Sequence, residues 1–134
     1  MKSTTVKAEF SIEGERLDPA IITDLLQINP DETWRKGDSI PCKSMVRRSG
    51  NWSIATEFEA SFDVNDQLSQ IVNIIKPKKE RLQNIREAYK LAYGFIIIIK
   101  IENNSKPAIH FDTDLINFVA EIKAEIGVDL YIYS

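Results

Sequence analysis

The chain is poor in the residue types that most enzymes use at neutral pH. Among its 134 residues it has one histidine, His110, and one cysteine, Cys42. Histidine has the side-chain pKa nearest neutrality, the cysteine thiolate is a ready nucleophile, and active sites usually combine several such groups. His110 and Cys42 lie far apart in the sequence and share no metal-ligand spacing. This scarcity predicts a protein without catalytic activity.

Other shortages exclude further classes of protein. A single cysteine cannot form an internal disulfide, and the five glycines form no phosphate-binding motif. The segment Met1–Lys7 lacks the apolar stretch of a signal peptide, and the apolar run Phe95–Ile99 is too short to span a bilayer. A net charge of −3 gives little attraction for nucleic acid or an anionic membrane. We therefore expect a cytoplasmic protein that has no cofactor and binds neither nucleic acid nor membranes.

What the chain does contain is typical of one globular domain, residues 1–134, with 43% hydrophobic and 28% charged residues. Strict alternation of apolar and polar residues predicts strands, and apolar residues at helical spacing predict amphipathic helices. The order β-α-β-β-α-α-β-α-β predicts an α+β fold: a mainly antiparallel sheet of about five strands with three to four helices packed against it. We expect strands over 6–12, 43–48, 52–59, 95–101 and 130–133, a loop over 29–41, and helices over 19–26, 64–75, 78–92 and a last segment capped by Gly127.

Two expectations concern the core. Trp52, Ile54 and Phe58 share one face of their predicted strand, and we expect that face to be buried. The strand 95–101 is apolar on both faces, which predicts a central strand that is covered from both sides.

An apolar residue followed by aspartate precedes three of the predicted helices. The aspartates are Asp18, Asp63 and Asp112. Aspartate is a favoured N-cap residue, because its carboxylate accepts hydrogen bonds from the free backbone N–H groups of the first turn. We expect all three aspartates to cap helices.

The string His110–Asp114 also has a catalytic interpretation. His110, Asp112 and Asp114 could together hold a divalent metal or form an acid/base pair, which would make the chain a metal-dependent hydrolase. Capping by Asp112 and the effect of the helix dipole on Asp114 explain the two carboxylates without catalysis. The hydrolase remains the alternative to a non-catalytic protein.

The residues that we expect to bind a partner lie in acidic loops and on the last strand. Carboxylates let an immunity-type protein approach a basic partner quickly, and tyrosine is favoured at binding hot spots. The tyrosines lie on the strand face opposite Leu130 and Ile132, where they either bind a partner or cover a helix. We expect another protein as the partner, and self-association through the strand 95–101 or an exposed sheet edge as a further alternative. The candidate contact residues are Glu13, Glu15, Asp31, Glu32, Tyr131 and Tyr133.

A family resemblance is carried by turn, core and helix-stop residues, which are Pro30, Trp34, Gly37, Asn51–Ile54, Ser61, Asp63, Leu68, Pro77, Gly127 and Leu130–Tyr133. Together they resemble the small bacterial proteins grouped as domain of unknown function 4279, over about Phe10 to Tyr133. The resemblance implies a bacterial or phage origin and brings no established reaction, cofactor or catalytic residue. By analogy it implies a specific protein-binding role, such as an immunity-type antitoxin or a modulator of phage defence.

Overall fold

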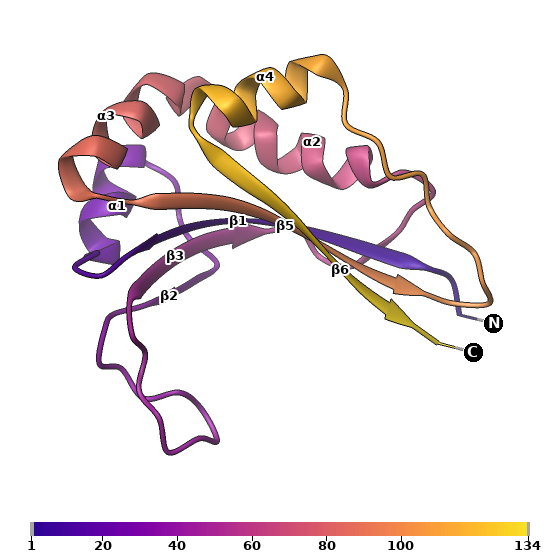
Figure 1. The fold of residues 1–134 in the computed structure, drawn as a ribbon, viewed down its shortest axis with the longest axis horizontal. Helices are drawn as coiled ribbons and strands as arrows, with labels where there is room; N and C mark the ends of the chain where they lie inside the picture. The colour runs from indigo at the N-terminus through magenta and orange to yellow at the C-terminus, as the bar shows by residue number, and fades with distance from the viewer. Residues whose placement is uncertain (1, 134) are drawn as a thin grey trace.

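The computed structural model describes residues 2–133 as one sheet with helices on one of its sides (Figure 1). The strand order is β2-β3-β1-β5-β6, and the short strand β4 also pairs with β1. Neighbouring strands are antiparallel except β5 and β6, which are parallel. The predicted α+β fold with a mainly antiparallel sheet is confirmed. The strands are β1 (Thr5–Gly14), β2 (Glu32–Trp34), β3 (Gly50–Ala55), β4 (Glu59–Ala60), β5 (Ala92–Ile101) and β6 (Ala124–Ile132).

The helices begin where the sequence predicts. Asp18, Asp63 and Asp112 are the N-cap residues of α1, α2 and α4, and each carboxylate accepts a hydrogen bond from a backbone N–H of the first turn. The short 3₁₀ turn η1 (Lys76–Lys78), which contains Pro77, separates α2 from α3. The helices are α1 (Pro19–Leu26), α2 (Val64–Ile75), α3 (Lys79–Tyr89) and α4 (Thr113–Glu121).

The core lies between the helices and the sheet face that they cover. Alternate residues of β1 and β5 are buried there, including Phe10 and Phe95, whose ring centroids are 5.0 Å apart. The hydroxyl of Tyr93 donates a hydrogen bond of 2.6 Å to the carbonyl oxygen of Leu82 on α3. Burial raises the pKa of Tyr93 well above its usual range. This polar contact ties the central strand β5 to the helical layer.

Trp52 and Ile54 are buried as expected, but Phe58 is not, and β5 is not covered from both sides. All four α-helices among residues 2–133 lie on one side of the sheet, so β5 is covered on one face only (Figure 1). Ile96 and Ile98 point to the other face and are half-buried. Phe58 lies beyond the end of β3 and is 36% exposed. Its ring packs beneath Lys100, whose Nζ is 3.9 Å from the ring centroid, instead of in the core.

Three local predictions also differ from the structure. The segment 43–48 is no strand but part of a long connection that holds one isolated bridge between Ser39 and Val46. The predicted loop 29–41 contains β2, which is formed by pairing with β3 rather than by any local apolar pattern. Helix α4 ends at Glu121, and Gly127 lies inside β6 instead of capping a helix. Lys123, with a φ of 56°, reverses the chain between α4 and β6.

Candidate functional site: the open face of the sheet

The face of the sheet away from the helices has a floor of small residues at its centre. The strand registers place Ser53, Ser11 and Gly94 side by side across β3, β1 and β5. The same row continues to Glu125 on β6, and Gly127 follows two residues further along that strand. Because cross-strand neighbours share a face, these residues all lie on the open side of the sheet. A shallow depression of about 300 Å³ lies over Ser11, Gly94, Glu125 and Gly127 of this set.

Gly94 and Gly127 have no structural reason to be glycine. A Cβ atom added at either position would meet nothing within 4 Å, and neither residue has a positive φ. Glycine inside a strand is destabilising by roughly 0.5–1 kcal/mol relative to alanine, because it loses more backbone freedom on folding. A glycine of this kind often marks a place where a ligand or another backbone approaches closely.

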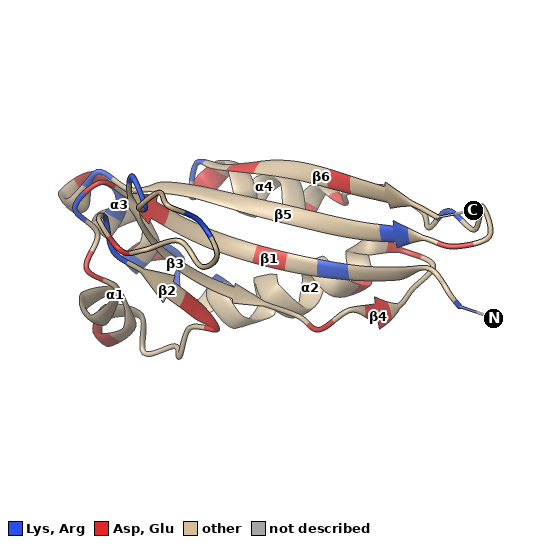
Figure 2. Ribbon diagram, turned by 90° about the horizontal axis from the view of Figure 1, so that it is seen from below, with Lys and Arg blue, Asp and Glu red and all other residues tan. Residues whose placement is uncertain are grey.

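The open face also gathers acidic side chains. The registers of β1, β2 and β6 place these side chains on the open face, and Figure 2, which views the sheet from that side, marks where acidic residues occur along β1 and β6. Within residues 2–133, none of these carboxylates belongs to an ion pair, although Glu13 accepts a hydrogen bond of 2.7 Å from the hydroxyl of Ser49. Five carboxylates lie on this face: Glu9, Glu13, Glu32, Glu125 and Asp129.

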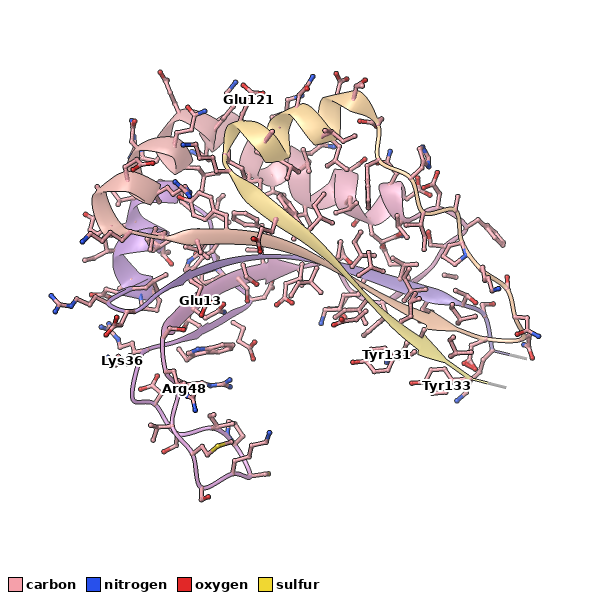
Figure 3. All side chains as sticks on the ribbon, in the orientation of Figure 1. Glu13, Lys36, Arg48, Glu121, Tyr131 and Tyr133 are labelled. Atoms are coloured by element: carbon pink, nitrogen blue, oxygen red, sulfur yellow. The ribbon has the colours of Figure 1, made fainter. Side chains whose placement is uncertain are left out.

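The end of the open face near the chain termini is cationic and aromatic. Lys7 and Lys100 both lie over the ring of Phe58, at 5.5 and 3.9 Å from its centroid. Tyr131 is the register partner of Lys100 on β6. Figure 3 shows Tyr131 and Tyr133 pointing away from the helices, and both side chains are exposed. The tyrosines therefore do not cover a helix.

The opposite end of the open face is bounded by the segment 35–49 between β2 and β3, which projects from the sheet on the side away from the helices (Figure 1). The guanidinium of Arg47 stacks 3.8 Å from the ring centroid of Trp34, the last residue of β2. The ammonium group of Lys36 forms an ion pair with the carboxylate of Glu15 at 2.7 Å, and the hydroxyl of Ser49 donates a hydrogen bond to the carboxylate of Glu13. These contacts attach one end of the projecting segment to the turn after β1 and the other end to β1 itself.

The structure brings together only part of the predicted partner-binding set. Glu13, Glu32, Tyr131 and Tyr133 share the open face. Glu15 lies in the turn after β1, and the hydrogen bond from Lys36 lowers its pKa. Asp31 has a structural contact, because its carboxylate accepts a hydrogen bond of 2.8 Å from the backbone N–H of Ala55. The four acidic residues of the predicted set therefore do not form one acidic patch.

Sequence reasoning missed the residues at the centre of the face. These residues belong to strands that the sequence predicts at least in part. Because side chains alternate between the two faces of a strand, the predicted core residues already imply that these residues lie on the other face. The alternation gives no sign that the second face is left uncovered. The missed residues are Glu9, Gly94, Glu125, Gly127 and Asp129.

The metal-site alternative finds little support in the geometry. Asp112 accepts hydrogen bonds from the Leu115 backbone N–H at 2.8 Å and from the Asn65 amide at 3.2 Å, and these bonds lower its pKa. His110 lies in an exposed loop with its Nδ1 3.6 Å from a carboxylate oxygen of Asp63, and Asp114 lies in the first turn of α4. Among residues 2–133, no three histidine, cysteine, aspartate or glutamate side chains are grouped so that they could hold a metal ion.

Comparison with known proteins identifies one family. The sequence model described as "Domain of unknown function (DUF4279)" matches residues 4–133, and the family resemblance predicted from the sequence is thereby confirmed. No curated protein and no solved structure matches the chain. In the part of the chain that the structure describes, no helix is both long enough and apolar enough to cross a membrane.

Proposed function

The chain belongs to the DUF4279 family, a domain of unknown function, and we propose that it is a non-catalytic protein-binding domain that receives its partner on the open face of the sheet. The observation that carries the proposal is the pair of glycines in the floor of that face. Gly94 and Gly127 weaken their strands and meet no neighbour above them. Close approach of a partner is the physical reason that glycine is useful at such positions.

The charge of the open face indicates the chemistry of the partner. Five carboxylates lie on the face, whereas its cations are at its two ends: Lys7 and Lys100 over Phe58, and Arg47 on Trp34. A basic surface on the partner would be attracted to the acidic centre, and complementary charge of this kind raises association rates. The partner that we propose is therefore a protein with a basic binding surface.

An immunity-type antitoxin is the form of this function that the acidic face fits best. The active surface of a nuclease toxin is basic because it binds phosphate groups. Carboxylates on a protein surface can take the place of those phosphates, so the acidic face would cover the basic surface and block it. We place this role in the cytoplasm of a bacterial cell, where a chain with a single cysteine needs no oxidising environment.

The experiment is co-purification from the native cells with matched charge variants. Glu125→Lys reverses one charge on the open face, and Asp24→Lys makes the same change on the exposed side of α1 in the helical layer. We expect one protein to be recovered at near-native concentration with the wild-type chain and with D24K, and to be lost with E125K. Recovery that is equal for both variants, or a wild-type chain that is recovered alone, would contradict the proposal.

A further inference from the structure

The two edges of the sheet differ sharply in length and protection. One edge is β2, which has three residues and is followed by the projecting segment 35–49. The other edge is β6, which has nine residues, and within residues 2–133 no strand pairs with its outer side. Figure 2 shows β6 along the border of the sheet over its full length. Long, flat edge strands usually carry proline, lysine or a bulge that discourages pairing, and β6 contains neither proline nor lysine.

The direction of the backbone groups of β6 follows from one hydrogen bond. The N–H of Tyr133 donates to the carbonyl oxygen of Ile101 at 2.9 Å, so the odd-numbered residues of β6 direct their N–H and C=O groups toward β5. Backbone direction alternates along a strand, so Val128, Leu130 and Ile132 direct theirs outward. These groups form a ready hydrogen-bonding edge.

The same three residues carry exposed apolar side chains. Val128, Leu130 and Ile132 point to the helix-covered face, but the helices reach only the first part of β6. Their exposed fractions are 39%, 52% and 68%, increasing toward the end of the strand. One stretch of chain therefore combines outward backbone groups with a row of uncovered apolar side chains.

All three residues of the row face one another in the symmetric register that is centred on Leu130. When two copies of β6 pair in antiparallel fashion about a two-fold axis at Leu130, Leu130 faces its own copy and Val128 faces Ile132 in both directions. This register also places the carboxylate of Asp129 opposite Tyr131 of the second copy. A register centred on Asp129 would instead oppose two carboxylates, and one centred on Gly127 would oppose Asp129 and Glu125, which is unfavourable for like charges.

We propose that β6 pairs with β6 of a second copy of this chain, in antiparallel register about Leu130, to form a dimer with one continuous sheet. The interaction leaves the glycine floor around Gly94 on the open face of each copy, so it is independent of the proposed partner binding. A contact confined to one strand edge is smaller than the about 800 Å² per partner that stable complexes bury, so we expect a dissociation constant in the micromolar range.

The register is tested by cysteine cross-linking in a Cys42→Ser background, because Cys42 is exposed. Leu130→Cys places two thiols on the two-fold axis, where the Cα atoms of a hydrogen-bonded pair lie about 5.5 Å apart and a disulfide fits. Ile132→Cys is the control, because position 132 is more exposed but its two copies would lie about 13 Å apart along the strands. We expect a disulfide dimer from L130C and not from I132C. Equal or faster cross-linking of I132C would overturn the register.

Dimer formation itself is tested by sedimentation velocity across concentrations from about 1 to 500 µM. Leu130→Lys opposes two ammonium groups at the axis, and Ile116→Lys adds the same charge at a helical position of nearly equal exposure, 50% against 52%. We expect the wild-type chain and I116K to dimerise with similar constants, and L130K to dimerise at least about tenfold more weakly. A wild-type chain that stays monomeric throughout this range, or an L130K variant that dimerises as the wild type does, would overturn the proposal.

Discussion

Replacing Gly94 with valine should make the protein more stable. Gly94 lies inside the central strand β5 with open space above it, so the new side chain meets no atom within 4 Å of its Cβ. Removing glycine from a strand gains roughly 0.5–1 kcal/mol of backbone entropy, and valine is among the residues most favoured in strands, on a scale that spans about 1 kcal/mol. We expect the free energy of unfolding to rise by about 1 kcal/mol and the Tm by about 3–5 °C.

Gly50 is the matched control for this experiment. A Cβ atom added there would lie 2.9 Å from the carbonyl oxygen of Leu17 and 3.1 Å from its Cβ. Overpacking of this kind costs about 1–3 kcal/mol, so Gly50→Ala should lower the free energy of unfolding. Urea unfolding with equal slopes for all variants measures both changes.

The two glycine variants separate folding from binding. If Gly94 is retained for close approach of a partner, G94V gains stability and loses the partner, so the two effects have opposite signs. A loss of stability in G94V would show that the fold itself requires glycine at this position, contrary to the open space above Gly94. A gain of stability in G50A would show that the close contacts with Leu17 do not limit the fold.

Three further predictions follow from contacts in the core and at the helix ends. Burial raises the pKa of Tyr93, so the unfolded chain loses this proton first and stability should fall as pH rises above about 10, the unfolded value. Tyr93→Phe should remove this alkaline loss and should cost about 1 kcal/mol at neutral pH for the lost hydrogen bond, as chemical unfolding at several pH values would show. The pKa of Asp112 is lowered in the folded protein, so its ionised carboxylate stabilises the fold at pH values above its unfolded pKa. This stabilisation is lost as the pH falls through the folded pKa. Asp112→Asn, which can still cap α4, should therefore make the Tm fall less steeply at acid pH. Ile97→Ala, on the covered face of β5, should cost about 2–5 kcal/mol, whereas Ile98→Ala on the open face should cost less than about 1.5 kcal/mol, and similar losses for both would contradict one-sided burial.

Local signals in the sequence predicted the helices well. The bounds of α2 agree with the predicted 64–75, because a capping aspartate, an apolar stripe and a following proline act within a few residues of one another. The last helix was predicted too long because Ile126 continues its helical spacing by coincidence. Ile126 instead lies on the same face of β6 as Ala124, with Glu125 between them on the other face, and pairing with β5 favours the strand.

The candidate site could not be predicted because it depends on which face of the sheet the helices leave uncovered. The local pattern of apolar and polar residues does not determine that. The apolar residues Ile96 and Ile98 suggested cover on both faces of β5, whereas the helices cover one. Phe58 looked like a core residue because alternation continued past the end of β3. Glu13 was predicted from the acidity of its loop, but its neighbours on the face, Glu9 and Glu125, come from strands that the sequence alone could not place side by side.

Binding of a protein partner on the open face of the sheet is the function that we propose. The most direct measurement is photo-crosslinking in the native cells, with a photoreactive amino acid in place of Ile96 on the open face or in place of Ile74, which is exposed in the helical layer. We predict a covalent adduct with one other protein from position 96 and none from position 74. Adducts from position 74 alone, or the same adducts from both positions, would contradict binding on the open face.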